Sequence, residues 1–333
     1  MKLSKKLERR GGFLKNYSYT PAEVPVIFGE VLFDQFPGSG AVLGGAPFNA
    51  AWHLQGFGLK PLMVSRVGRD SLGEKVLESM KSWDMDIRGI QVDPHYPTGT
   101  VQVHLEEGEP RYNILPDQAY DYIDTTQALK ALEKVKPSLP SLLYHGSLAL
   151  RNETSRSTWN NLRAAAAGAP IFIDINLREP WWDMESIWSF LREARWAKMN
   201  DSELSLVLQK FPDSPLSLEN QDIPPSAVNT AAVKLYRQIN CSLLIVTLGA
   251  RGALLTSGTE TWQKKPVPVK DMVDTVGAGD AFSAVNILGL TRGWEPQVIL
   301  ERSLEFASRI LQIQGAAQNN PALYQYFMRR WKL

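Results

Sequence analysis

The string DTVGAGDAF at residues 274–282 sets one aspartate, Asp274, before a run of very small residues and another, Asp280, within its second half. Side chains this small contribute little to a hydrophobic core, so the use of the run must lie in its backbone. A Gly-Ala-Gly sequence leaves consecutive backbone N–H groups open to a ligand, and such groups bind anions. The string therefore predicts an anion-binding turn between two carboxylates.

A helix is expected directly after this turn. The residues that share one helical stripe are Ala281, Phe282, Val285, Leu288 and Gly289. Gly293 is placed where such a helix would end. The free N–H groups and the positive end of the helix dipole then point at whatever occupies the turn, which suits the negative charge of a phosphoryl group in transfer.

Asp280, in the first turn of the predicted helix, is the candidate base for an acceptor hydroxyl. The helix dipole holds it ionised and therefore weakly basic, which is sufficient because the transition state of phosphoryl transfer is loose. The alternative is structural: Asp280 caps a helix and the glycines turn the chain. The length of the string favours the chemical interpretation.

Short apolar runs alternate with helical patterns along the chain. The predicted strands lie at residues 24–29, 61–65, 100–105, 142–145, 171–175, 197–199 and 243–247. The predicted helices include residues 71–83, 154–167, 184–194 and 227–238. Runs that are apolar throughout are typical of strands buried on both faces, and the alternation indicates βαβ units with a largely parallel sheet.

One region departs from this alternation. Residues 96–122 alternate polar and apolar side chains around the turn Glu107-Gly108-Glu109-Pro110. This pattern predicts a hairpin with one solvated face, and we interpret it as part of a small β-sheet lid. The Pro- and Ser-rich residues 211–225 predict a surface loop.

Composition excludes several functions. The chain has 36 Lys+Arg and 35 Asp+Glu, which gives a net charge of +1. This balance does not indicate a protein that binds nucleic acid through a positively charged surface. One cysteine, Cys241, excludes an intrachain disulfide and a thiolate zinc cluster. No apolar run approaches the roughly 18 residues of a membrane span, and the basic residues 1–25 lack the apolar centre of a signal peptide. We expect a cytoplasmic protein with no membrane partner and a disordered or amphipathic extension at residues 1–25.

The string DTVGAGDAF resembles the signature of the ribokinase-like (PfkB) carbohydrate kinase family. Other stretches resemble family motifs in the same order, from about residue 26 to 321: GEVLFD at 29–34, LGGAPFNAA at 43–51, SRVGRDSLG at 65–73, DINLR at 174–178, NDSE at 200–203 and TLGARG at 247–252. The Gly-Gly-Ala-Pro and DINLR stretches are similar to those of fructokinases. The resemblance implies a three-layer α/β/α fold over residues 26–333, with a mostly parallel sheet and a small β-sheet lid drawn from residues 31–43 and 97–122.

The resemblance also implies how the phosphate side of the site works. Asp280 takes the proton from the hydroxyl that is phosphorylated, and the N–H groups of Gly277, Ala278 and Gly279 stabilise the γ-phosphoryl charge of ATP. The implied nucleotide-binding residues are Asn200, Thr247, Gly249, Gly252, Gly279 and Asn319. Asn319 departs from the pattern, because smaller residues are common at its position.

Two cations are implied by the same resemblance. Asn200 and Glu203 lie near Mg²⁺, with Glu203 holding it through water, as suits a cation that loses hydration reluctantly. Asp274 marks a site for a monovalent cation such as K⁺, together with carbonyls of Val276 and Gly315. A turn-capping aspartate is the alternative for Asp274.

The implied sugar-binding residues are Asp34, Gly44, Gly45, Asn49, Tyr112 and Arg178. The glycine pair lets the backbone approach the sugar, while Asp34 and Asn49 offer directional hydrogen bonds to hydroxyls. A helix cap is the alternative for Asn49, and a solvated cation is the alternative for Arg178. No arginine follows Tyr112, where ketodeoxygluconate kinases tend to hold a substrate carboxylate, and this favours a neutral sugar.

The predicted activity is transfer of the γ-phosphoryl group of ATP to a small neutral sugar, with fructose converted to fructose 6-phosphate. The alternatives are a kinase for ribose, 2-keto-3-deoxygluconate or a nucleoside, and a catalytically silent kinase-fold regulator. Retention of Asp280 and of the glycines disfavours the silent regulator, although fold alone does not imply function. A β lid often pairs with another copy in this family, so a homodimer through the lid is expected.

Overall fold

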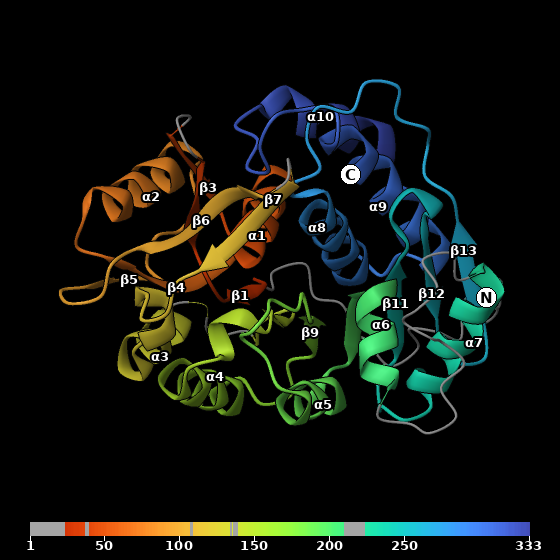
Figure 1. The fold of residues 1–333 in the computed structure, drawn as a ribbon, viewed down its shortest axis with the longest axis horizontal. Coiled ribbons are helices and arrows are strands. Elements are labelled where there is room, and N and C mark those ends of the chain that lie inside the picture. Colours follow the sequence, from red (N-terminus) through yellow and green to blue (C-terminus); the bar gives the residue numbers. More distant parts are fainter. Residues whose placement is uncertain (1–23, 37–39, 107–108, 134, 136–138, 210–223) are drawn as a thin grey trace, which may run out of the picture.

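The computed structural model describes residues 24–36, 40–106, 109–133, 135, 139–209 and 224–333, and Figure 1 shows their arrangement. Residues 1–23 of the predicted extension lie outside the described residues, as does most of the loop predicted at residues 211–225.

A nine-stranded sheet runs through the centre of the described residues, with helices on both faces (Figure 1). In sheet order its strands are β13 (Thr261–Lys264), β12 (Ala253–Thr256), β11 (Leu243–Thr247), β10 (Trp196–Asn200), β9 (Ile171–Asp174), β8 (Leu143–His145), β1 (Val26–Phe28), β4 (Leu62–Gly68) and β5 (Ile90–Asp93). The strands from β11 to β5 pair in parallel, and β12 and β13 add an antiparallel edge. The prediction of a mostly parallel sheet is therefore confirmed.

Most side chains of the central strands are apolar because they alternate between two cores, with Lys198 and Asp174 as buried charged exceptions. In β1, Ile27 enters one core, while Val26 and Phe28 enter the other. The first core is closed by α1 (Ala46–Gly56), α2 (Ser71–Ser82), α8 (Ala278–Thr291), α9 (Pro296–Ile310) and α10 (Pro321–Trp331). The second core is closed by α3 (Thr125–Glu133), α4 (Glu153–Ala165), α5 (Met184–Glu193), α6 (Asp201–Leu208) and α7 (Pro225–Tyr236). The result is a three-layer α/β/α arrangement.

The predicted helices at residues 71–83, 154–167, 184–194 and 227–238 correspond to α2, α4, α5 and α7. Asp70, Asn152 and Asp183 cap the first three of these helices with side-chain oxygens, which explains where they begin. None of the helices in the described ranges has the length and apolar character that a membrane crossing needs.

A smaller sheet of four strands also forms in the described part of the chain. Its order is β3 (Gly40–Gly44), β2 (Leu32–Phe36), β6 (Gly99–Glu106) and β7 (Glu109–Ile114). Leu32, Val101 and Ile114 pack with Leu148 into a minor core, which joins this sheet to the main body. The predicted small sheet is present, but the segment after β7 leaves it and ends in the short helix η1 (Ala119–Tyr122).

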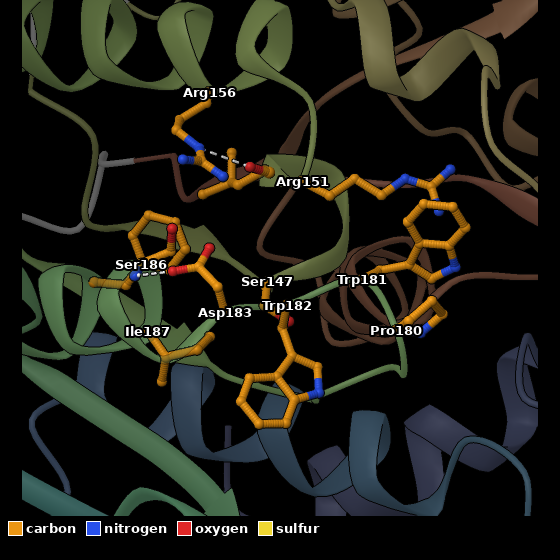
Figure 2. Close-up of a pocket in the computed structure, with 11 residues that line it drawn as sticks. Ser147, Arg151, Arg156, Pro180, Trp181, Trp182, Asp183, Ser186 and Ile187 are labelled. Carbon is orange, nitrogen blue, oxygen red and sulfur yellow. Dashed lines mark hydrogen bonds between the residues drawn. The ribbon is translucent and has the colours of Figure 1, made fainter. Parts of the chain in front are cut away.

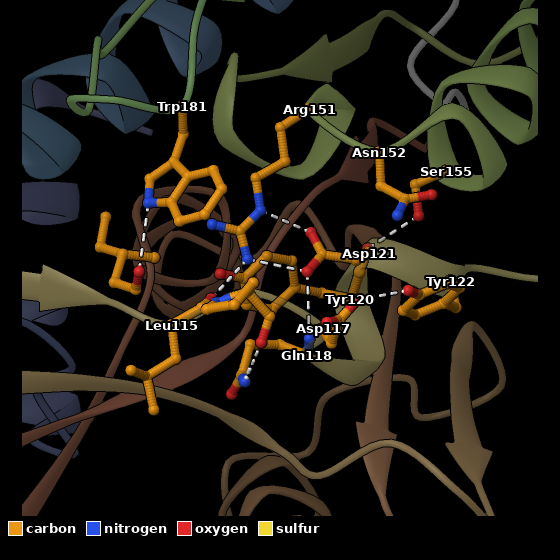
Figure 3. Close-up of polar contacts among 12 residues, drawn as sticks. Leu115, Asp117, Gln118, Tyr120, Asp121, Tyr122, Arg151, Asn152, Ser155 and Trp181 are labelled. Carbon is orange, nitrogen blue, oxygen red and sulfur yellow. Dashed lines mark hydrogen bonds and ion pairs between the residues drawn. The ribbon is translucent and has the colours of Figure 1, made fainter.

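Arg151 holds the base of the small sheet (Figure 3). Its Nε and Nη2 donate to the two carboxylate oxygens of Asp121, each at 2.7 Å, and Nη2 also donates to the carbonyl of Leu115 at 2.6 Å. Trp181 stacks on the guanidinium, 4.2 Å from the ring centroid, and donates to the Ile114 carbonyl. Both charged side chains are nearly buried, at 6% and 2% exposure. These contacts fix where β7 ends against the main body.

Arg151→Met should lower the free energy of unfolding by about 3–5 kcal/mol, because it leaves Asp121 buried without its cation. Urea unfolding followed by tryptophan fluorescence measures the loss. Arg88→Met is the matched control, since Arg88 pairs with Asp86 at the surface, where an ion pair contributes about 0–1 kcal/mol. Equal losses in the two variants would contradict a structural role for the Arg151 pair.

Candidate active site

A cavity of about 350 Å³ lies at the carboxyl ends of β9, β10 and β11, the edge at which open α/β sheets bind ligands. Leu32, Val101 and Ile114 of the small sheet also line it, so the cavity is bounded by both sheets. The predicted site residues that line it are Asp34, Gly45, Asn49, Arg178, Asn200, Glu203, Thr247, Val276, Gly277, Gly279 and Asp280.

The turn before Asp280 has the geometry of an open helix N-terminus. Gly277 is the N-cap of α8 at φ 81°, the left-handed conformation that favours glycine. A Cβ on Gly277 would lie 2.2 Å from the Cβ of Ala316, so a larger side chain has no room. The amide of Ala281 bonds to the Gly277 carbonyl, and the amides before it begin the helix without intrahelical partners. Since Gly277 and Gly279 line the cavity, those amides start beside it.

Asp280 contacts a residue from the other end of the chain. Nδ2 of Asn49 donates to Oδ2 of Asp280 at 2.7 Å across a separation of 231 residues. Asn49 is 3% exposed and lies inside α1, whose N-cap is Gly45, so the alternative of a helix cap at Asn49 is wrong. The amide instead orients the carboxylate of Asp280.

Burial raises the pKa of Asp280 above its usual range, although the hydrogen bond from Asn49 and the charge of Lys198 lower it. The side chain still faces the cavity, which it lines. The sequence predicts a weak base held ionised by the helix dipole, whereas in the structure desolvation outweighs the stabilising contacts. Asp280 is therefore a stronger base than the sequence predicts.

Asp34 and Asn49 line the cavity and lie close to Gly44, which is not among the lining residues. A Cβ on Gly44 would lie 3.5 Å from Oδ2 of Asp34 and 4.0 Å from Nδ2 of Asn49. Gly45 has φ 107°, and a Cβ there would lie 2.7 Å from the carbonyl oxygen of Glu30. Burial raises the pKa of Asp34 to about 6. Polar side chains and closely approaching backbone thus surround the part of the cavity that is predicted to bind the sugar.

Arg178 follows β9 and lines the same cavity. Burial raises the pKa values of Glu30, Asp34 and Asp280, and the positive charge of Arg178 lowers them. Arg178 is exposed to solvent, but its charge still influences these three acids. Tyr112 lies in β7, but its side chain is outside the described part of the structure, and its contact with a sugar stays a prediction.

Sequence reasoning missed a buried cation beside the glycine turn. Nζ of Lys198, in β10, lies 2.6 Å from Oδ2 of Asp174, and the Ser283 hydroxyl donates to the same oxygen at 2.8 Å. Burial lowers the pKa of Lys198, but the attraction of Asp174 outweighs it and the net shift is upward. A Cβ on Gly279 would lie 3.7 Å from Nζ, so a positive charge adjoins the turn. The sequence feature that could have revealed this cation is Lys198 itself, a lysine within the predicted strand at residues 197–199.

Asn200 and Glu203 form a capping box at the start of α6. Oδ1 of Asn200 accepts the Glu203 amide at 2.8 Å, and Oε2 of Glu203 accepts the Asn200 amide at 2.7 Å. Oε1 of Glu203 accepts the amide of Leu177, which precedes Arg178. Both carboxylate oxygens thus serve the backbone, and water-mediated binding of Mg²⁺ by Glu203 stays a prediction. The described residues contain no cluster of three or more metal-ligating side chains.

Asp274 joins the two segments predicted to hold a monovalent cation. Its Oδ1 accepts the amide of Val276 at 2.9 Å, and its Oδ2 accepts the amide of Gly315 at 3.0 Å. The three predicted residues therefore lie together, while the cation itself stays a prediction. A turn-capping aspartate would make the same bond to the Val276 amide. This contact therefore agrees with the cation site and with the turn cap alike.

Of four further residues predicted to bind the nucleotide, only one lines the cavity. Thr247 ends β11 and lines the cavity. Gly249 and Gly252 follow in a turn with φ of 56° and 100°, and neither lines the cavity. Asn319 is exposed just before α10 and also lies outside the cavity lining. Contacts of all four residues with ATP stay predictions.

A second cavity, of about 220 Å³, adjoins the loop between β9 and α5 (Figure 2). Trp181 and Trp182 of that loop line it together with Arg151 and Arg156, and no predicted site residue does so. The two tryptophans therefore lie outside the lining of the candidate active site.

Comparison with known proteins agrees with this geometry. The model of the pfkB family carbohydrate kinases matches residues 37–323. A fructokinase of Solanum tuberosum is 30% identical over 293 residues, 83% of this chain and 82% of that protein. An ATP-dependent 6-phosphofructokinase of Thermoanaerobacterium thermosaccharolyticum is 28% identical over 287 residues, 84% of this chain and 81% of that protein.

The fold has a solved counterpart as well. The crystal structure of the fructokinase from Vibrio cholerae, bound to fructose, ADP and calcium ion, matches with a TM-score of 0.71 at 23% identity. The match covers 92% of this chain and 99% of that one, and it confirms the ribokinase-like fold. From the family match and the site geometry together, the chain belongs to the pfkB family of carbohydrate kinases and is a phosphotransferase with an alcohol group as acceptor.

Proposed function

We propose that this enzyme transfers the γ-phosphoryl group of ATP to a hydroxyl of a small neutral sugar, with fructose converted to fructose 6-phosphate. The observation that carries the proposal is the position of Asp280, which lies in the first turn of α8, accepts a hydrogen bond from Asn49 and lines a cavity between two sheets. The proposed base, the helix N-terminus proposed to bind the phosphoryl group and the groups proposed to bind hydroxyls thus line one cavity.

Asp280 accepts the proton of the sugar hydroxyl, and its raised pKa improves it as a base. Asn49 holds the carboxylate in place. The amides at the start of α8 and the ammonium group of Lys198 stabilise the negative charge of the phosphoryl group as it moves. ATP supplies that group when it is bound, with Thr247, Gly249, Gly252 and Asn319 on its side of the site.

Asn200 and Glu203 are the residues proposed to hold Mg²⁺ near the phosphates. Both oxygens of Glu203 already accept amides, which favours contact through a water that stays on the metal. Asp274, Val276 and Gly315 are the residues proposed for K⁺. A carboxylate and backbone carbonyls are the hard oxygen ligands that such a cation takes.

A neutral sugar suits the cavity better than a charged one. Glu30, Asp34 and Asp280 line it, while Arg178 and the already paired Lys198 are the cations among its described lining residues. A sugar acid or a sugar phosphate would meet repulsion from Asp34 and Asp280 in their ionised forms. The relatives named fructokinase support fructose, and the relative named 6-phosphofructokinase makes fructose 6-phosphate a necessary comparison.

The small sheet is proposed as a lid over the sugar, because Asp34 and Val101 line the cavity from that sheet. A homodimer through this sheet belongs to the same proposal. The edge strand β3 carries the exposed Val42 and offers unpaired backbone groups to a second copy. We also propose that the enzyme acts in the cytoplasm.

Asp280→Asn should lower kcat with fructose by about 10²–10⁴-fold, because an amide cannot accept the proton. The affinity for fructose should change little, since the amide keeps the shape of the side chain. A coupled ADP-release assay and calorimetric binding measure the two quantities. Glu74→Gln is the matched control, an exposed acid in the first turn of α2 that should keep full activity. Turnover near wild type in Asp280→Asn would refute the assignment of the base.

In a panel of acceptors, fructose should give the highest kcat/KM, and turnover should require Mg²⁺ and increase with K⁺. The deciding comparisons are ribose, 2-keto-3-deoxygluconate, adenosine and fructose 6-phosphate, each measured by ADP release. A higher kcat/KM for one of these would reject fructose as the substrate. Release of ADP that needs no acceptor at all would contradict a sugar kinase.

A further inference from the structure

Glu30 is a buried acid that the mechanism above does not use. It follows β1, is 2% exposed and lines the same cavity as Asp280. Its Oε2 has no hydrogen-bond partner among the described residues and is shielded from bulk solvent. A buried polar atom without a partner costs free energy unless a ligand supplies the missing bond. Glu30 is therefore placed to meet a polar group inside the cavity.

The surroundings of Glu30 belong to the sugar side of the cavity. Its carbonyl oxygen adjoins Gly45, where a Cβ would lie 2.7 Å away. Asp34 and Asn49, the groups proposed to bind sugar hydroxyls, line the same cavity, and Asp34 lies on the next strand along the chain. Glu30 therefore borders the part of the cavity proposed for the sugar.

Charged and titratable groups from several elements act on Glu30. They are Arg178 after β9, Asp280 in α8, Arg151 before α4, Tyr120 in η1 and Tyr144 in β8. Burial is the largest influence and raises the pKa of Glu30 to about 7, against the lowering effects of its own amide and of the two arginines. Near neutral pH a large share of the side chain is therefore uncharged and carries an O–H donor.

We propose that Glu30 is a sugar-contacting residue, whose neutral carboxyl group donates a hydrogen bond from Oε2 to an oxygen of the acceptor sugar. The inference rests on the sugar kinase activity proposed above and adds one residue to its substrate recognition. Asp34, when ionised, accepts a hydrogen bond from a hydroxyl, so the two acids together present a donor and an acceptor. A polyhydroxylated, uncharged ligand matches this pair, whereas a ligand anion does not match Asp34.

Glu30→Ala removes the donor, and Glu30→Gln replaces it with an amide donor of nearly the same shape. With fructose as the probe, Glu30→Ala should raise the KM for fructose roughly tenfold or more, as loss of a buried hydrogen bond does, and leave the KM for ATP unchanged. Glu30→Gln should recover most of the affinity. Asp93→Asn is the matched control, because Asp93 is a buried acid that pairs with Arg66 outside the cavity lining.

The pH profile separates a sugar contact from a structural role. The neutral form of Glu30 is present below its pKa of about 7 and is lost as the pH rises through that value, so the wild-type KM for fructose should rise above pH 7. Glu30→Gln keeps its donor at every pH, and its KM should rise less. Asp34 and Asp280 titrate in both proteins, so the difference between the two profiles reports on Glu30.

A wild-type fructose KM in Glu30→Ala, or an equal increase in Asp93→Asn, would overturn the inference and leave the proposed kinase activity intact. Parallel pH profiles for wild type and Glu30→Gln would overturn it as well. A wild-type enzyme that phosphorylates no sugar overturns the proposed activity and this inference together, and the unmodified enzyme alone reveals that result. Should another sugar of the panel exceed fructose in kcat/KM, that sugar becomes the probe.

Discussion

Desolvation of Asp280 is the physical constraint on which the rest of the site depends. An aspartate at an exposed helix N-terminus is a poor base, and burial improves it only if other groups hold the charge that burial destabilises. Asn49 and Lys198 supply that support from α1 and β10, while the first amides of α8 stay beside the cavity. The fold must therefore bring a helix from each end of the chain and a central strand to one point.

The pair between Lys198 and Asp174 shows how the central sheet contributes. Burying two charges costs desolvation energy that their attraction hardly exceeds, so such a pair is weak evidence for stability. Its position is more informative, because Nζ adjoins Gly279 and the Ser283 hydroxyl ties Asp174 to α8. The pair holds a positive charge against the glycine turn and fixes the helix that carries it. Both properties suit the transfer of a phosphoryl group, whose negative charge a fixed cation can stabilise.

Local sequence patterns predict much of the fold and the core of the site. The individual strands, the β6–β7 hairpin and the turn before α8 each follow from residues close together in the chain, whereas the pairing of β2 with β6 joins distant segments. The roles of Lys198 and Glu30 could not be predicted, because their burial and their neighbours come from distant segments. The strengthened basicity of Asp280 has the same cause, since its desolvation depends on the packing of α1 and β10. The helix-cap interpretation of Asn49 is wrong because Gly45, four residues earlier, already caps α1.

The hydrogen bond between Asn49 and Asp280 also bears on how the enzyme is made. The same two ends of the chain meet again where His53 of α1 lies 3.0 Å from the hydroxyl of Tyr324 in α10, across 271 residues. Domains emerge from the ribosome N-terminal end first, and contacts of such long range form late. A nascent polypeptide that still lacks α8 and α10 has neither Asp280, the proposed base, nor two of the helices that close the first core. The site therefore forms only after α8 and α10 have been synthesised, and a product that ends before α8 lacks the proposed base.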